Sequence, residues 1–239
     1  MKKYIIIFSF LFFLFCKKGE PEVIVKVINL KPFFLELSLE IKNFDYVDSV
    51  IIVRFQEPYS PLKFSHRGLI NSFKDTLLNP DFAYKYLIKV KGSNVKETSL
   101  NVKTPVPSDY ILVPEPIYLE TDKSFNLSLK IYNCNKIFGI SGRILFENSF
   151  LKVDSLKKGS IWSQDDLFFS TVKQDTIFFA VTKKRGALYF SGSGKVLNVY
   201  FSKNNTGVSD IIPLKIVLTD SDGNYLPLPK IKRGKIIIK

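Results

Sequence analysis

The sequence predicts an all-β protein made of two β-sandwich domains that follow a short apolar leader. Apolar and polar residues alternate in segments that recur about every 8–14 residues, separated by Asn, Asp, Gly, Pro, Ser or Lys, which is typical of a β-sandwich. Hydrophobic residues make up 46% of the chain and aromatic residues 14%, so a sizeable core can form. Prolines concentrate in segment 106–116, which predicts a stiff connector between two domains.

The first 15 residues have the layout of a secretory signal, with a basic start and an apolar run over 4–15. This run is shorter than the roughly 20 residues that a membrane-spanning helix needs. Cys16 follows directly and resembles the cysteine of the bacterial lipoprotein lipobox. The resemblance implies a cleaved signal peptide (1–15), a lipid on Cys16 and a polar leash (16–21), outside the cytoplasm on the cell membrane or outer membrane. Because Phe15 is larger than the residue usual at that place, an uncleaved anchor or plain secretion are the alternatives.

Residues 22–105 predict a first sandwich of six or seven strands. The candidate strands are 23–30, 33–41, 49–55, 73–77, 84–90 and 98–102. Leu78, Pro80 and Tyr84 have the spacing of the corner before a late strand of fibronectin type III domains, which this segment resembles. The resemblance implies an immunoglobulin-like sandwich in which the Tyr84 hydroxyl bonds back to the backbone and fixes the turn between the sheets.

Residues 117–239 predict a second and longer sandwich. The candidate strands are 117–120, 125–132, 139–146, 151–155, 176–182, 194–201, 211–219 and 234–238.

Several short motifs of this second segment resemble, in order and spacing, those of cohesin domains. They are an early strand (125–131), a turn and strand start (146–153), a glycine after the fourth strand (159–161), a glycine-led strand (194–201), an Asp-Gly hairpin (218–226) and a closing strand (234–239). The resemblance implies a jelly-roll-like sandwich without catalytic activity that binds dockerin modules of other proteins through the outer face of one sheet.

The strand over 139–146 is expected to carry the contact with this partner. If its apolar residues face inward, then Ser141, Arg143 and Leu145 face outward. The cohesin resemblance implies that this outward row recognises the partner. An acidic partner would suit Arg143 and the basic charge of the chain.

The net charge of the chain is +13, and removal of Lys2 and Lys3 with the leader leaves +11. A basic surface suits nucleic acid, anionic lipid or an acidic protein. In an exported chain whose lysines are spread along the strands, we expect solvated outward faces and no nucleic-acid partner. Once Cys16 carries a lipid, Cys134 has no partner for a disulfide and is expected to fill space in the core.

Residue types that perform catalysis or bind metals are scarce. His66 is the only histidine, and a lone histidine in an expected loop is more often a surface residue than a base or ligand. Segment 220–224 has its glycine fourth, whereas a calcium-binding EF-hand loop has it sixth, so a hairpin turn is the better interpretation. We therefore predict no enzyme, no metal and no cofactor.

Two alternatives to a protein-binding module remain open. A carbohydrate-binding surface protein would use exposed aromatic side chains to bind a polysaccharide, with Tyr189, Trp162 and Tyr200 as candidates. A structural envelope lipoprotein would have no specific ligand.

Overall fold

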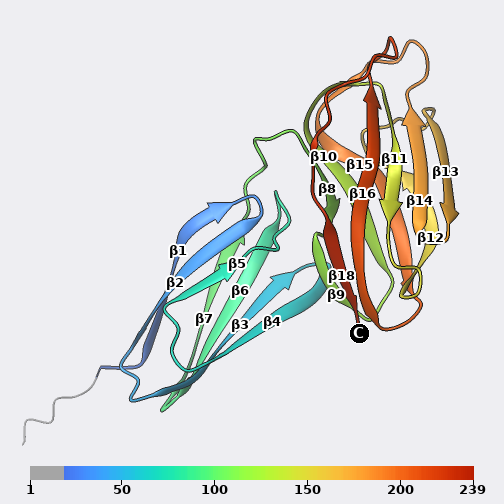
Figure 1. The fold of residues 1–239 in the computed structure, drawn as a ribbon. Helices are drawn as coiled ribbons and strands as arrows, with labels where there is room; N and C mark the ends of the chain where they lie inside the picture. Colours follow the sequence, from blue (N-terminus) through green and yellow to red (C-terminus); the bar gives the residue numbers. More distant parts are fainter. Residues whose placement is uncertain (1–18) are drawn as a thin grey trace, which may run out of the picture.

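The structure, a computed structural model, describes residues 19–239, which form strands and turns arranged in two β-domains (Figure 1). The predicted signal peptide and the predicted lipid-attachment residue Cys16 lie outside the described residues. Figure 1 shows an elongated molecule in which the chain enters the first domain at the end opposite to the second domain. Within residues 19–239, no helix has the length and apolarity needed to cross a membrane.

The first domain packs a three-stranded sheet, β1-β2-β5, against a four-stranded sheet, β4-β3-β6-β7. Its strands are β1 (Glu22–Lys31), β2 (Phe34–Lys42), β3 (Val47–Gln56), β4 (Tyr59–Arg67), β5 (Ser72–Asp75), β6 (Ala83–Gly92) and β7 (Val95–Lys103). Alternate residues of the facing strands point inward, among them Leu35, Leu37, Val50, Ile52 and Ile88, all of which are fully buried. The period-two pattern that predicts the strands therefore also places the core.

Strand β4 is absent from the strands that the sequence predicted. Pro61 interrupts this segment, and proline weakens the expectation of a strand because it has no N–H to donate. In the structure β4 lies at the edge of its sheet and pairs only with β3, so one side of the strand needs no donor. His66 consequently lies in a strand and not in a loop, half-buried, with its ring edge-on to Phe73 at a centroid distance of 6.1 Å.

Tyr84 fixes the corner that leads into β6. The backbone N–H of Asn79 donates a hydrogen bond to the Tyr84 hydroxyl at 2.6 Å, which is the backbone contact expected of this tyrosine. Burial raises the pKa of Tyr84, so the hydroxyl stays protonated at neutral pH. The hydroxyl of Thr104 donates to the carbonyl oxygen of Asn79 at 2.7 Å and ties the same corner to the end of the domain.

The second domain consists of two larger sheets, β12-β15-β10-β8-β17 and β13-β14-β11-β16-β18-β9. Its strands are β8 (Ile111–Glu115), β9 (Tyr118–Thr121), β10 (Phe125–Ile137), β11 (Gly139–Leu145), β12 (Leu151–Lys158), β13 (Leu167–Lys173), β14 (Thr176–Thr182), β15 (Phe190–Lys203), β16 (Gly207–Thr219), β17 (Lys230–Ile231) and β18 (Gly234–Ile238). Side chains such as Leu127, Leu129, Ile144, Val199 and Phe201 form a continuous core between the sheets.

Strand β8 corrects the predicted connector 106–116. Four of its five residues are buried, and it pairs along its length with β10. On its other side β8 pairs with β17 only at Ile111 and Leu112, so Pro114 lies where that side of the strand is unpaired. A proline without an N–H is tolerated at such a place. The connector between the domains is therefore shorter than the prolines suggested.

The two domains pack directly against each other. Phe33, between β1 and β2, contacts a buried cluster of the second domain formed by Ile111, Val113, Ile117 and Tyr132. The backbone N–H of Ile117 donates to the side-chain oxygen of Asn79 at 2.8 Å, a buried hydrogen bond between the domains.

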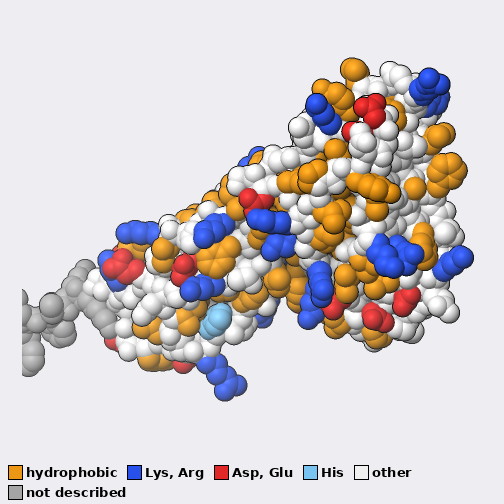
Figure 2. All heavy atoms as spheres, turned by 45° about the horizontal axis from the view of Figure 1, so that its top comes forward, with side chains coloured by type: hydrophobic (Ala, Val, Ile, Leu, Met, Phe, Trp, Pro, Cys, Tyr) orange, Lys and Arg blue, Asp and Glu red, His pale blue; other side chains and the backbone are white. Residues whose placement is uncertain are grey.

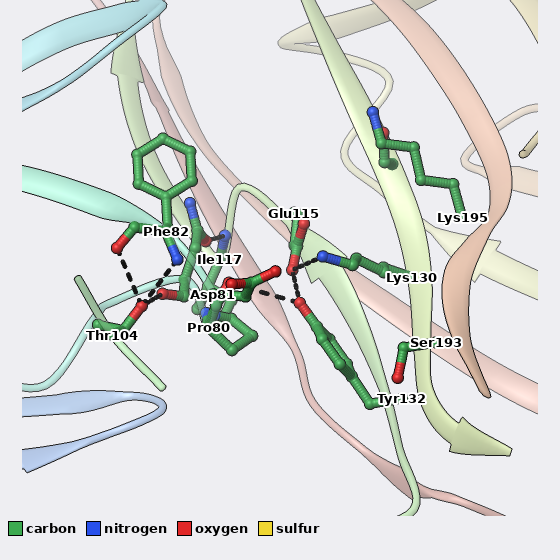
Figure 3. A network of polar contacts seen from close by, with 12 residues as sticks. Pro80, Asp81, Phe82, Thr104, Glu115, Ile117, Lys130, Tyr132, Ser193 and Lys195 are labelled. Carbon is green, nitrogen blue, oxygen red and sulfur yellow. Dashed lines mark hydrogen bonds and ion pairs between the residues drawn. The ribbon is translucent and has the colours of Figure 1, made fainter. Parts of the chain in front are cut away.

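The Tyr132 hydroxyl adds a polar contact at this junction. It donates to the Glu115 carboxylate and lies 3.4 Å from the carbonyl oxygen of Pro80, in the first domain (Figure 3). The Lys130 ammonium nitrogen lies 3.9 Å from the same carboxylate oxygen, above the ring of Tyr132.

Glu115 should make the stability of the protein depend on pH. Burial raises the pKa of this carboxyl above its usual 4.5, although the Tyr132 hydrogen bond and Lys130 act in the opposite direction. The charged carboxylate therefore lowers the free energy of unfolding at neutral pH. This loss disappears as the pH falls from the raised pKa of the folded protein to the lower pKa that Glu115 has in the unfolded chain. We expect Glu115→Gln to raise the melting temperature at pH 7 and to leave it unchanged below about pH 4. Thermal melts of both proteins between pH 4 and 7 measure this, and a difference independent of pH would contradict it.

Candidate functional site

The candidate site is the outward surface of four neighbouring strands, β13, β14, β11 and β16, which we name the outer face. On β11, Ile140 and Ile144 are buried in the core, whereas Ser141, Arg143 and Leu145 are partly exposed on the opposite side. The structure thus places these three residues on the side of the strand that the sequence alternation predicts.

Arg143 stacks on an aromatic ring of the neighbouring strand. It is in register with Phe178 of β14, and its guanidinium carbon lies 4.9 Å from the centre of the Phe178 ring. A cation–π contact at an exposed site contributes about 0.5–1 kcal/mol and holds the guanidinium against the sheet. No carboxylate among residues 19–239 forms an ion pair with Arg143, so its donors are available to an anionic partner.

The next row across the outer face consists of Phe169, Ala180, Ser141 and Val217, which are in register on the four strands. Phe169 is 65% exposed and Val217 is 37% exposed. Because the two residues between them are small, the surface dips there into a shallow hollow of about 410 Å³ that also reaches Arg143.

Lys215 reaches the rim of this hollow from a β-bulge. The pairing of β11 with β16 shifts register between Ser141 and Arg143, which adds one residue on the β16 side. Lys215 has a φ of 50°, in the left-handed region, as an inserted bulge residue can. On the inner side of the sheet, a Cβ at Gly142 would lie 2.5 Å from Ile216 Cδ1, so any larger residue there would displace the end of the Ile216 side chain.

The outer face is basic and apolar. Arg143 and Lys215 are the charged residues that line the hollow, and no Asp or Glu of the described chain lines it. Figure 2 shows hydrophobic side chains exposed among lysines and arginines on the second domain. Exposed aromatic rings together with arginine are the composition that marks the centres of protein–protein interfaces.

A structured loop between β12 and β13 holds β13 at the edge of the outer face. The Lys158 ammonium donates to the carbonyl oxygens of Ser163, Gln164 and Asp166 at 2.7, 2.6 and 2.7 Å. Burial acts to raise the pKa of Asp166, but hydrogen bonds from Ser163 and the nearby Lys183 outweigh it and lower the pKa, so this carboxylate is charged. The charged groups thus bind the loop to itself and to the start of the segment after β14.

Phe169, Phe178 and Lys215 belong to the outer face but were not predicted. Phe169 lies on β13, an exposed edge strand whose run of aromatic and β-branched residues was the available signal. Phe178 lies on a strand that was predicted, but its position beside Arg143 depends on how β14 pairs with β11, which the sequence does not show. The bulge at Lys215 has no local sequence signal that we can identify.

The aromatic residues considered for sugar binding do not share a surface. Trp162 is only 8% exposed, and its indole N–H donates to the carbonyl oxygen of Val196 at 2.8 Å. Tyr200 is half-buried on β15, in the other sheet, with the Lys157 ammonium 5.1 Å from its ring centre. Tyr189 is half-exposed and precedes β15. This trio therefore cannot form a sugar-stacking row.

Cys134 is buried and unpaired, and burial raises the pKa of its thiol to about 11, so it is protonated at neutral pH. Its sulfur lies 3.1 Å from the carbonyl oxygen of Gly192.

Among the residues that the structure describes, no three His, Cys, Asp or Glu side chains are grouped so as to hold a metal ion.

No family model matches the sequence, and a search of curated proteins gives no match either. Solved structures do give matches.

Three of these structures illustrate the similarity. A non-cellulosomal cohesin from the archaeon Archaeoglobus fulgidus has 21% identity and a TM-score of 0.47, covering 55% of this chain and 92% of its own. The OlpA cohesin of Clostridium thermocellum, solved in complex with a dockerin, has 17% identity and a TM-score of 0.49, covering 55% and 100%. The sixth cohesin of Acetivibrio cellulolyticus scaffoldin B, also solved with a dockerin, has 15% identity and a TM-score of 0.48 over the same shares. These three solved structures are cohesin modules.

Proposed function

We propose that the protein is a membrane-anchored extracytoplasmic lipoprotein that binds another protein through a cohesin-like second domain. The observation that carries the binding function is the outer face, where the exposed Phe169 and the Arg143–Phe178 stack surround a shallow hollow. Small molecules are held in concave sites that enclose most of their surface. A broad face with aromatic and arginine anchors fits a folded protein partner better.

The positions of the sequence motifs support a cohesin-like domain. Gly159 lies directly after β12, where a Cβ would come within 2.0 Å of the carbonyl oxygen of Lys195 on β15, so the motif glycine is required sterically. The closing strand β18 completes the sheet beside β16. The proposed partner is therefore a dockerin-type module, the class that the two solved complexes contain, with acidic groups facing Arg143 and Lys215.

The first domain is proposed to be a fibronectin type III-like spacer. Its seven strands in two sheets and the bond between Tyr84 and the Asn79 backbone support this assignment. With a lipid on Cys16, the chain would enter this domain at the end away from the second domain, so the outer face would stand one domain away from the membrane (Figure 1). Mass spectrometry of the mature N-terminus tests the anchor, and an unmodified thiol on an intact leader would rule it out.

Arg143→Glu should abolish capture of the native partner. The variant reverses the charge at the centre of the outer face and removes the cation–π stack on Phe178, and a wrong charge at an interface costs several kcal/mol. The measurement is a pull-down from an extract of the source cells with the wild type and the variant, followed by mass spectrometry of the captured proteins.

Lys152→Glu is the matched control, because it makes the same change of charge at an exposed lysine of β12, in the other sheet. Partner capture by Arg143→Glu at the wild-type level would exclude the outer face. Equal losses with both variants would show that total charge, and not this face, determines capture.

A further inference from the structure

A cleft between the two domains forms a second concave site, separate from the outer face. It has a volume of about 630 Å³. Residues of β4 and the corner before β6 line one side, and residues of β8, β9, the turn after β9, β10 and β15 line the other. Figure 3 shows Asp81 of the first domain beside Glu115 of the second, with Lys130 beyond it. Ligand sites are typically about 300–1,000 Å³ and occur preferentially at domain interfaces. We name this site the junction cleft.

Several polar groups in the junction cleft have no partner in the protein. The side-chain oxygen of Asn126 is buried and accepts no hydrogen bond within residues 19–239. The Tyr59 hydroxyl and the Lys195 ammonium likewise have no hydrogen-bond partner in the described chain. A buried polar atom without a partner costs free energy. Asn126 lines the cleft, so a ligand there can supply the missing donor once the side chains that cover the Asn126 oxygen move aside. Burial raises the pKa of Tyr59 to about 12, so its hydroxyl remains a donor at neutral pH.

The charges of the junction cleft nearly balance. Asp81 and Glu115 are opposed by Lys123, Lys130 and Lys195. A strongly anionic ligand would meet the two carboxylates, and a cationic ligand would meet the three ammonium groups. A neutral ligand that both donates and accepts hydrogen bonds avoids either repulsion.

The apolar lining of the cleft is aromatic. Phe125 is partly exposed there and stacks on the buried Phe201 behind it at a centroid distance of 5.4 Å. The half-buried Tyr59 and Phe82 contribute further rings. Aromatic rings combined with uncharged acceptors and donors match a molecule that has both C–H surfaces and hydroxyl groups.

We propose that the junction cleft binds a neutral saccharide. Sugar hydroxyls donate to the free oxygen of Asn126 and accept from the Tyr59 hydroxyl and the Lys195 ammonium, while a sugar ring packs on Phe125. This inference goes beyond the proposed protein-binding function and uses none of the residues of the outer face. It also uses none of the aromatic residues considered for sugar binding from the sequence.

The test titrates the full-length protein in detergent with cellotetraose, xylotetraose, maltotetraose and chitotetraose by isothermal calorimetry. We expect at least one of them to bind, and we expect Tyr59→Phe and Asn126→Ala each to weaken that binding roughly fivefold, the effect of one lost hydrogen bond. Lys195→Met, at an exposed position, gives a third variant that does not threaten folding. Tyr189→Ala, an exposed aromatic residue outside the cleft, should leave the affinity unchanged.

The possible outcomes separate this proposal from the proposed function. Failure of all four sugars to bind at millimolar concentration would overturn it, as would binding of inorganic phosphate in their place. Sugar binding that survives the combined Tyr59→Phe, Asn126→Ala and Lys195→Met changes would place the sugar elsewhere and also overturn it. Arg143→Glu should bind the sugar as the wild type does, so loss of the protein partner and loss of the sugar are measured independently.

Discussion

Replacing Asp75 by alanine should destabilise the first domain by about 3–5 kcal/mol, because it leaves the Arg54 guanidinium charged and unpaired inside the core. Both side chains of this ion pair are buried, with exposures of 0% and 3%. One guanidinium nitrogen of Arg54 donates to both carboxylate oxygens of Asp75 at 2.8 Å, and the Tyr86 hydroxyl donates to the same carboxylate at 2.9 Å. The alanine variant removes the acceptor for all of these donors at once.

Removing both charges should cost much less than removing one. Arg54→Met combined with Asp75→Leu leaves no buried charge, and apolar replacement of a whole buried pair is often neutral or stabilising. The other guanidinium nitrogen of Arg54 also donates to the Gln56 side chain at 2.9 Å, so Gln56→Leu completes the apolar set. We expect this triple variant to recover part of the stability lost by Asp75→Ala, because the buried Tyr86 hydroxyl still lacks the acceptor that Asp75 supplies.

Urea unfolding followed by two signals measures this effect. Trp162 is the only tryptophan and belongs to the core of the second domain, so its fluorescence reports that domain. Far-ultraviolet circular dichroism reports both domains. Asp75→Ala should move the first part of the dichroism transition to lower urea concentration and shift the Trp162 transition less. A single variant as stable as the wild type, or a triple variant as unstable as the single one, would refute the assigned role of the pair.

The Arg54 pair also shows what the sequence pattern does and does not predict. The run of apolar residues over 50–53 located strand β3, but all four are apolar, so the sequence does not say that Val50 and Ile52 are the ones that face inward. Arg54 continues the same inward row, where the pattern predicts an apolar residue. Its partner Asp75 is on β5, in the opposite sheet, and that pairing depends on the fold of the whole domain.

The strands that were not predicted share a physical cause. β4, β13 and β17 are edge strands, and one side of β8 is largely unpaired, so these segments tolerate prolines and exposed residues that a central strand excludes. β8 shows the consequence most clearly, because Pro114 made a buried strand resemble a linker. Local pattern therefore locates the centres of the sheets more reliably than their edges.

The candidate site was predictable only along a single strand. The alternation on β11 placed Ser141, Arg143 and Leu145 on its outward side. The stacking of Arg143 on Phe178 depends on the register between β11 and β14, and the hollow depends on which residue of β13 lies beside Ala180. Register follows from packing of the whole domain, so no local motif contains it.

Gly159→Ala should destabilise the second domain by about 1–3 kcal/mol or more and should also weaken partner capture. An added Cβ would lie 2.0 Å from the carbonyl oxygen of Lys195 and 2.7 Å from the carbonyl carbon of Val196, both in the backbone of β15. Backbone atoms of a central strand cannot move aside as a flexible side chain can, so the chain around Gly159 must shift instead.

This shift should reach the outer face through the loop that Gly159 begins. The N–H of Gly159 donates to Val196 at 3.0 Å, and the N–H of Ile161 donates to Lys195 at 3.2 Å, so the start of the loop is bound to β15. The same loop leads into β13, which carries Phe169 at the rim of the hollow. Displacement of the loop therefore moves an anchor of the proposed interface without changing any residue that touches the partner.

Gly186→Ala is the matched control, because Gly186 has a φ of 85° but a Cβ added there would meet no atom within 4 Å beyond its chain neighbours. That variant should lose only the roughly 1 kcal/mol that a left-handed backbone costs a residue with a side chain. Thermal melting followed by Trp162 fluorescence, together with the partner pull-down, measures both effects. Two results together would contradict this prediction: a melting temperature of Gly159→Ala equal to that of Gly186→Ala, and partner capture by Gly159→Ala at the level of Gly186→Ala. The close approach of this loop to β15 would then have no part in shaping the outer face.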